Sequence, residues 1–77
     1  MIFLINILLN GYKGKMGKSV VDYINKNTTE FNILYKIDKD TLALYNDILV
    51  KPDVIIDFST PYSSFIALEY AIEHLVP

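Results

Sequence analysis

The chain contains three glycines, and all three stand at a spacing of three between an apolar run and an amphipathic segment, in Gly11-Tyr-Lys-Gly-Lys-Met-Gly17. Where a strand turns into a helix, glycines let the backbone approach a phosphate closely because they carry no side chain. The N-terminus of the helix adds N–H donors and partial positive charge. This stretch therefore predicts a phosphate-binding turn, and the segments around it have to supply the strand and the helix.

The apolar run before the glycines covers residues 1–9 and is rich in Ile and Leu. Such a run predicts a strand that is buried on both faces, as in a parallel sheet covered by helices. No basic segment precedes it, no cleavage site follows it, and it is much shorter than the roughly 20 residues of a membrane-spanning helix. We therefore expect neither a leader peptide nor a membrane anchor, and we expect a cytoplasmic protein.

After the glycines the spacing of apolar residues becomes helical, which predicts a helix from Met16 to Asn27. Met16, Val20, Val21 and Ile24 share one face of it. Methionine at this spacing is usually a core contact, and Met16 is also the sixth residue of the glycine-rich stretch. We therefore expect Met16 to pack in the core, to contribute to the phosphate-binding turn, or to do both.

The next apolar run, residues 31–38, predicts a second strand with Asp38 at its carboxyl end. In a strand–turn–helix–strand unit, an acidic residue about 20 to 30 residues after the glycines accepts hydrogen bonds from the hydroxyls of an adenosine ribose. Lys39 follows at once, and a cation there can accept a 2′-phosphate. The alternative is an Asp in a loop that faces water and a lysine that is simply solvated.

The rest of the chain predicts a short helix within residues 40–51, a strand at 53–58, and a helix from Pro61 to about His74, capped by Thr60. Phe65, Leu68, Ile72 and Leu75 trace one face of that last helix. If the strand at 53–58 lies beside the first strand, its carboxyl end faces the glycine-rich turn at a topological switch point, where open α/β sheets bind ligands.

The composition excludes several kinds of functional site. The 77 residues include no cysteine and one histidine, so that disulfides, thiolate metal sites and a catalytic triad are not expected. That histidine, His74, stands in the last turn of a predicted helix, where the helix dipole favours a cation. A net charge of −2 gives no general attraction to nucleic acid or to an anionic membrane. We predict an α/β fold, a Rossmann-like parallel sheet with flanking helices, in a chain shorter than a usual nucleotide-binding domain.

Three parts of the chain together resemble one family. They are Asn10-Gly-Tyr-Lys-Gly-Lys-Met-Gly17, Asp38 after the second predicted strand, and Asp53-Val-Ile-Ile-Asp-Phe-Ser-Thr-Pro61. The pair Gly-x-x-Gly-x-Met-Gly and Asp-Phe-Ser-x-Pro is more specific than either motif alone. With these motifs the chain resembles the N-terminal part of the 4-hydroxy-tetrahydrodipicolinate (dihydrodipicolinate) reductases of lysine and diaminopimelate biosynthesis, over essentially its whole length.

The resemblance implies an oxidoreductase that transfers a hydride from NADH or NADPH to a cyclic imine dicarboxylate. It implies that residues 11–16 wrap the pyrophosphate, that Asp38 and Lys39 meet the adenosine ribose or its 2′-phosphate, and that residues 58–60 line the nicotinamide end. The predicted cofactor-binding residues are Gly11, Tyr12, Lys13, Gly14, Lys15, Met16, Gly17, Asp38, Lys39, Phe58, Ser59 and Thr60. The choice between NADH and NADPH stays open.

The family pattern continues with a second domain whose His-His-Lys region binds and protonates the substrate, and through which a homotetramer is mainly built. We therefore expect residues 1–77 to be a partial NAD(P)-binding domain without catalytic residues or a metal site, and to be inactive alone. Two other hypotheses stay open. One is a non-catalytic Rossmann domain that senses nucleotides. The other is a different NAD(P)-dependent dehydrogenase or epimerase with a similar glycine-rich loop.

Overall fold

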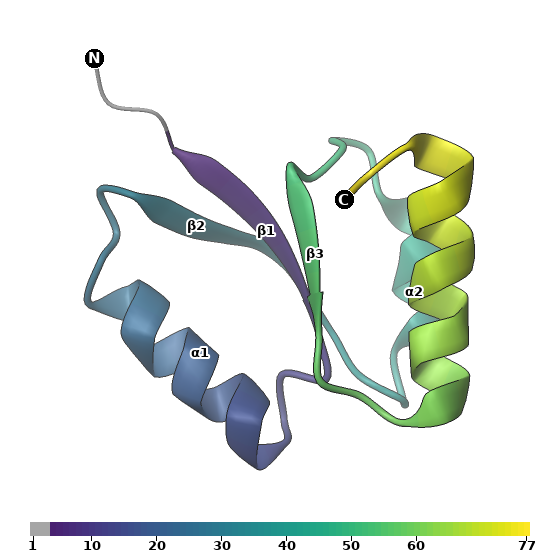
Figure 1. Cartoon of the computed structure of the whole chain (residues 1–77), viewed down its shortest axis with the longest axis horizontal. Helices are drawn as coiled ribbons and strands as arrows, with labels where there is room; N and C mark the ends of the chain where they lie inside the picture. Colours follow the sequence, from purple (N-terminus) through teal and green to yellow (C-terminus); the bar gives the residue numbers. More distant parts are fainter. Residues whose placement is uncertain (1–3) are drawn as a thin grey trace.

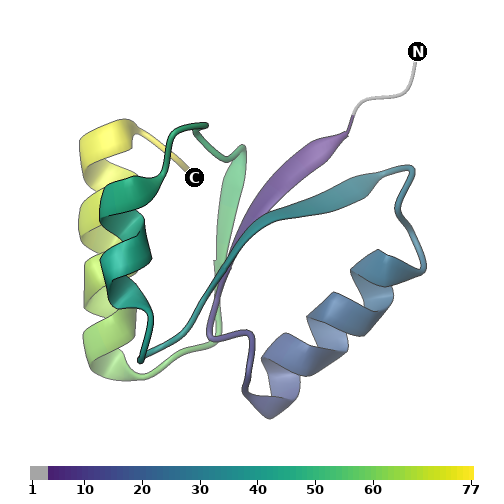
Figure 2. The same cartoon turned by 180° about the vertical axis from the view of Figure 1, so that it is seen from behind.

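The computed structural model describes residues 4–77 as a parallel sheet between two helical layers. In chain order the elements are β1 (Ile5–Asn10), α1 (Lys15–Asn25), β2 (Phe31–Ile37), the 3₁₀ helix η1 (Leu42–Asp47), β3 (Val54–Asp57) and α2 (Pro61–His74). The strand order is β2-β1-β3, and both pairings are parallel. Helix α1 covers one face of the sheet, while η1 and α2 cover the other (Figures 1 and 2). The predicted fold class, an incomplete Rossmann-like sheet, is confirmed.

From Ile7 to Asn10 the central strand β1 is buried on both faces, as predicted, whereas Ile5 at its start is 41% exposed. Ile7 and Leu9 pack with Ile24 of α1 in one core cluster, and Leu8 packs with Tyr70 of α2 in the other. Successive side chains of a strand point to opposite faces, so an uninterrupted apolar run serves both layers. The part of the predicted strand that falls on residues 1–3 lies outside the described residues.

The three strands end at the same edge of the sheet. Asn10 at the carboxyl end of β1 is paired with Ile37 of β2 and with Asp57 of β3. The expectation that the strand at 53–58 lies beside the first strand is therefore confirmed. As a result, the loops that follow β1, β2 and β3 leave the sheet side by side, at the topological switch point between β1 and β3.

Helix α1 begins one residue earlier than expected and ends at Asn25. Val20, Val21 and Ile24 belong to the core cluster beneath it, as expected. Met16 is 56% exposed, so its interpretation as a core contact was wrong. Met16 is exposed because it lies in the first turn of α1, next to the glycine-rich loop. This end of the helix lies beyond the ends of the strands.

Helix α2 has the predicted bounds and the predicted cap, because the Thr60 side chain accepts a hydrogen bond from Ser63 N and Pro61 is the first helical residue. Its orientation is different from the one that the sequence implied. The face that packs on the sheet carries Ser63, Ala67 and Tyr70. Another face carries four large apolar side chains, and each of them is 55–82% exposed: Phe65, Leu68, Ile72 and Leu75. Small residues permit a close approach to the sheet. The apolar residues of α2 are spread around the helix, so their spacing does not decide its rotation.

The segment after β2 forms the expected short helix as the 3₁₀ helix η1, whose Tyr45 is buried against Tyr70 with ring centroids 5.5 Å apart. Tyr45 lies deeper in this layer than a surface tyrosine, with 7% of the residue exposed. Its hydroxyl is buried and has no hydrogen-bond partner among residues 4–77. Burial raises the pKa of this phenol because the charged form would lose its hydration.

Candidate functional site

The glycine-rich loop begins with a residue that only glycine fits well. Gly11 has a φ of +88°, and its N–H donates to the carbonyl of Ile37 at 2.7 Å. A Cβ atom on Gly11 would lie 2.6 Å from the carbonyl oxygen of Phe58. The missing side chain therefore lets the loop after β3 come into contact with the loop after β1, in addition to allowing the turn.

The other two glycines have different roles. Gly17 is buried inside the first turns of α1, and a Cβ there would collide with the carbonyl oxygen of Gly11 and the backbone of Tyr12. Gly14 is the N-cap of α1, and a Cβ on it would meet only the Gly11 carbonyl oxygen, at 3.7 Å. No side chain caps α1, and its first turn holds no acidic residue. The start of α1 thus presents backbone donors beside an open glycine, which suits an anion.

Asp38 lies at the carboxyl end of β2 and is buried, with 4% of the residue exposed. Its Oδ1 accepts hydrogen bonds from Thr41 Oγ1 at 2.8 Å and from the backbone N–H of Asp40 at 3.1 Å. The alternative of a loop Asp that faces water is therefore wrong. The turn after β2 holds this carboxylate in one orientation at the edge of the site.

The second oxygen of Asp38 forms an ion pair with a lysine of the glycine-rich loop. Lys13 Nζ lies 3.0 Å from Asp38 Oδ2, and the two side chains are 59% and 6% exposed, respectively. The hydrogen bond and the charge of Asp38 raise the pKa of Lys13, while the hydrogen bonds from Lys13 and Thr41 lower the pKa of Asp38. The pair thus joins the loop after β1 to the loop after β2.

The turn between β3 and α2 is held by a buried amide. Asn10 is fully buried, and its Nδ2 donates to Asp57 Oδ1 at 3.1 Å, Ser59 Oγ at 3.0 Å and the Ser63 carbonyl at 3.1 Å. Burial works against ionisation of Asp57, but hydrogen bonds from Ser59, Ser64 and Asn10 hold its pKa below the ordinary value. The Phe58–Thr60 turn is therefore fixed against the end of β1.

These three loops surround one hollow of about 440 Å³. It is lined by eight of the residues predicted from the sequence, together with Asp40 and Ser63: Gly11, Lys13, Gly14, Asp38, Lys39, Phe58, Ser59 and Thr60. Tyr12, Lys15, Met16 and Gly17 are not in this lining. Tyr12 packs instead against the core cluster under α1, and Lys15 and Met16 point outward from the first turn of α1 with exposed side chains.

Sequence reasoning missed Asn10, Asp40 and Ser63 as parts of this site. A polar residue that ends a continuous apolar strand is a usable signal for Asn10, because a buried amide needs partners close by. Asp40 and Ser63 had no comparable signal. They border the hollow only because the turn after β2 and the start of α2 meet at the same edge of the sheet.

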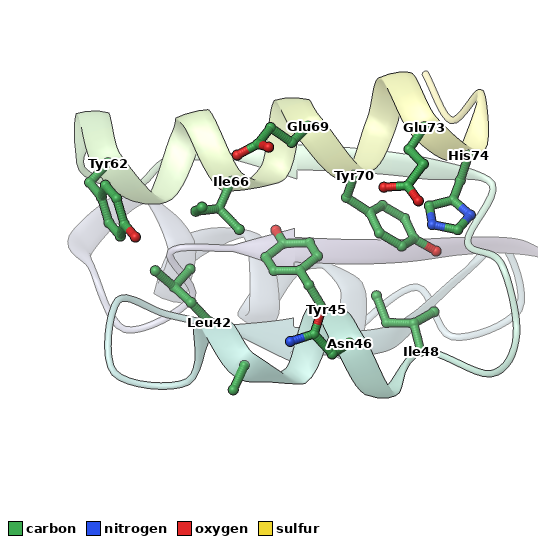
Figure 3. A pocket seen from close by; sticks show the side chains of 11 residues that line it. Leu42, Tyr45, Asn46, Ile48, Tyr62, Ile66, Glu69, Tyr70, Glu73 and His74 are labelled. Atoms are coloured by element: carbon green, nitrogen blue, oxygen red, sulfur yellow. The ribbon is translucent and has the colours of Figure 1, made fainter.

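A larger hollow of about 550 Å³ lies between η1 and α2 (Figure 3). Figure 3 shows Tyr62, Ile66, Glu69, Tyr70 and His74 on α2 facing Leu42, Tyr45 and Ile48 of the segment that contains η1. The ring of His74 stacks on that of Tyr70, with centroids 4.3 Å apart, which fits the structural role expected for this histidine. The hollow contains no part of the glycine-rich loop, so size alone does not make it the functional site.

Among residues 4–77, no three His, Cys, Asp or Glu side chains are grouped so that they would hold a metal ion. Within the same residues, every helix is too short or too polar to cross a bilayer.

The family model and the similar proteins that match the chain all name the same reductase. The family model described as dihydrodipicolinate reductase, N-terminus, matches residues 5–77. A 4-hydroxy-tetrahydrodipicolinate reductase of Rickettsia akari (strain Hartford) is 40% identical over 72 residues, which are 92% of this chain and 29% of the relative. The reductase of the same name from Campylobacter jejuni subsp. doylei is 38% identical over 69 residues, or 88% of this chain and 26% of the relative.

A third relative, the 4-hydroxy-tetrahydrodipicolinate reductase of Rickettsia bellii (strain OSU 85-389), is 39% identical over 59 residues, or 75% of this chain and 23% of the relative. No solved structure matches the chain significantly. The chain spans less than a third of the length of these relatives. Because the family model covers all but the first four residues, the chain belongs to the dihydrodipicolinate reductase family and corresponds to its N-terminal part.

Proposed function

We propose that the chain is the dinucleotide-binding part of a 4-hydroxy-tetrahydrodipicolinate reductase, and that it binds NADH or NADPH in the hollow between the loops after β1, β2 and β3. The observation that carries the proposal is the convergence of Gly14, Asp38 and the Phe58–Thr60 turn on one hollow of about 440 Å³. These groups are the ones needed for a pyrophosphate, a ribose and a nicotinamide, and they come from three separate segments of the chain.

The residues present fit such a cofactor. The backbone at Gly14 and the uncapped start of α1 offer N–H donors and partial positive charge to the pyrophosphate. Asp38, held by Thr41 and Asp40, offers a fixed carboxylate to the adenosine ribose. Phe58, Ser59 and Thr60 form the opposite wall, where the Asn10 amide holds their turn in place.

The reduced nicotinamide supplies the hydride for the proposed reaction, the reduction of a cyclic imine dicarboxylate. The role of this chain is then to hold the cofactor and to place its nicotinamide at the Phe58–Thr60 turn. We further propose that binding and protonation of the substrate require a second domain outside residues 1–77. This division of labour fits a chain that covers less than a third of its relatives.

Binding is tested by titrating NADH and NADPH into the chain and following nicotinamide fluorescence. The diagnostic variant is Gly14→Asp, because aspartate is a favoured N-cap residue and its carboxylate would occupy the donors that the pyrophosphate needs. We expect saturable binding to the wild-type chain and a loss of at least tenfold in affinity for both cofactors in Gly14→Asp, with unchanged circular dichroism.

The matched control is Asn25→Asp, which adds the same negative charge at the other end of α1. It should bind both cofactors within about threefold of the wild type. An absence of saturable binding to the wild-type chain, or equal binding by Gly14→Asp, would overturn the proposed site.

The comparisons favour the reductase family over a different dehydrogenase or epimerase, because every relative described above carries the reductase name. A nucleotide-sensing role predicts cofactor binding without reduction by the whole protein. Assaying the whole protein with 4-hydroxy-tetrahydrodipicolinate therefore separates the sensor from the enzyme.

A further inference from the structure

Asn10 ends β1 as a fully buried polar residue, and its side chain reaches three positions of the segment that follows β1 on one side of the sheet. Its Nδ2 lies 3.1 Å from Asp57 Oδ1, 3.0 Å from Ser59 Oγ and 3.1 Å from the Ser63 carbonyl oxygen. An amide nitrogen carries two hydrogens, so these three acceptors share them. One side chain thus ties the end of β3, the turn after it and the first turn of α2 to the central strand.

The oxygen of the same amide makes no comparable contact. Asn10 Oδ1 is buried and has no hydrogen-bond partner among residues 4–77. A buried acceptor without a partner costs free energy, so this side chain is a poor choice for packing alone. What the amide contributes is therefore its two hydrogens, and these are directed at the segment from β3 to α2.

The turn that these hydrogens hold forms one wall of the hollow. Ser59 Oγ accepts from Asn10 and donates to Asp57, and the Ser59 backbone N–H donates to the same carboxylate at 3.1 Å. Phe58 lines the hollow but is 43% exposed, and it belongs to neither core cluster of the described residues. Packing therefore contributes little to the position of this wall, and the hydrogen bonds at the end of β1 contribute most.

The other half of the hollow is built without the Asn10 side chain. Asp38 is held by the hydroxyl of Thr41 and the backbone N–H of Asp40. The three acceptors of Asn10 Nδ2 all lie outside the glycine-rich loop and the turn after β2. Loss of the amide should therefore disturb the wall assigned to the nicotinamide and leave the groups assigned to the pyrophosphate and the ribose in place.

We propose that Asn10 is a positioning residue for the nicotinamide: its amide hydrogens fix the Phe58–Thr60 turn, and this turn sets the orientation in which the nicotinamide ring is held. The inference rests on the proposed function, since it requires the cofactor to bind in this hollow. It goes beyond that function because it divides the hollow into a half that depends on Asn10 and a half that does not.

The test compares NADH with ADP-ribose, which has the same two riboses and pyrophosphate but no nicotinamide. Isothermal titration calorimetry gives the dissociation constants of both ligands for the wild-type chain and Asn10→Ala. We expect Asn10→Ala to bind NADH about tenfold more weakly, as for the loss of a hydrogen bond to a charged group, and ADP-ribose within about threefold of the wild type. The fluorescence emission of bound NADH should also move toward that of free NADH, because a displaced turn admits water to the ring.

A second substitution of the same residue separates hydrogen bonding from packing. Asn10→Asp keeps the size of the side chain but sets a carboxylate against Asp57 Oδ1 and the Ser63 carbonyl oxygen, where the amide donates. Two carboxylates at such a distance repel each other. This variant should therefore bind NADH more weakly than Asn10→Ala does. A role in packing alone predicts the opposite order, because only the alanine variant leaves a cavity.

The matched control is Asn27→Ala, which removes another amide that donates to a backbone carbonyl, that of Tyr23 at 2.7 Å, just after the carboxyl end of α1. It should change neither dissociation constant. Circular dichroism checks that each variant is folded. If Asn10→Ala does not fold, Asn10→Ser takes its place in the same comparison, because its hydroxyl keeps one buried donor but is too short to reach all three acceptors.

The outcomes separate the two proposals. If the wild-type chain does not bind NADH, the proposed function fails and the inference with it. If the wild-type chain binds NADH and ADP-ribose, but the folded Asn10 variants weaken both ligands equally or leave NADH binding unchanged, only the positioning role of Asn10 is overturned.

Discussion

At the scale of single residues, two glycines of the same motif differ in what surrounds them. A Cβ on Gly17 would collide with the backbone of residues 11 and 12, whereas a Cβ on Gly14 would lie at an ordinary contact distance of 3.7 Å from its nearest neighbour. Backbone atoms cannot move aside as the end of a side chain can. The third glycine is therefore needed for the packing of α1 on its own loop, and the second for the open surface of the hollow.

We expect Gly17→Ala to lower the free energy of unfolding by about 2 kcal/mol or more, since overpacking of a tight site costs about 1–3 kcal/mol and here the obstacle is backbone. The matched variant Gly14→Ala should lower it by less than about 1 kcal/mol, the loss expected from a poorer N-cap. Urea unfolding followed by circular dichroism measures both. Equal destabilisation by the two variants would contradict the packing role of Gly17.

At the scale of elements, α2 shows how a helix can present its more apolar face to solvent. The buried side of α2 is made of Ser63, Ala67 and Tyr70, and its exposed side includes Phe65, Leu68 and Ile72. At the neighbouring edge, on the side of β3 that faces away from β1, Ile55 N donates a hydrogen bond to the carbonyl of Pro77 at 2.8 Å. An apolar helix face beside a strand edge is a site of self-association.

We expect Leu68→Lys to raise the fraction of soluble monomer of the chain while changing its free energy of unfolding by less than about 1 kcal/mol, because Leu68 is 55% exposed. The contrasting variant Ala67→Lys places the same charge at a site that is 3% exposed and should prevent folding. Size-exclusion chromatography and urea unfolding measure the two effects. A large destabilisation by Leu68→Lys would show that this face is packed.

At the scale of the whole molecule, the described residues form a thin slab with extents of 35 × 27 × 18 Å, and the loops after all three strands open at one edge. The hollow at that edge is the proposed dinucleotide site. The proposed reaction also needs groups that bind a dicarboxylate and deliver a proton, which the proposal places in another domain.

We therefore expect the purified chain to bind NADPH without oxidising it in the presence of 4-hydroxy-tetrahydrodipicolinate, as followed by the loss of nicotinamide absorbance. The 4-hydroxy-tetrahydrodipicolinate reductase of Rickettsia akari, assayed under the same conditions, is the positive control. Turnover by the chain alone that is lost in Gly14→Asp would contradict the division between a cofactor domain and a substrate domain.

The sequence alone determined the element types, the parallel sheet, the cap of α2 and most of the lining of the hollow. These features follow from local patterns: an apolar run long enough for a strand buried on both faces, three glycines before a helical spacing, and a Thr-Pro start. Only the tertiary structure decided which face of α2 is buried, that Met16 is exposed, that Asn10 holds the turn after β3, and that Lys13 pairs with Asp38. The Asn10 and Lys13 contacts join segments that are distant in sequence at one edge of the sheet. The exposure of Met16 and of one face of α2 depends on how each helix lies against the sheet, and local periodicity carries no information about either.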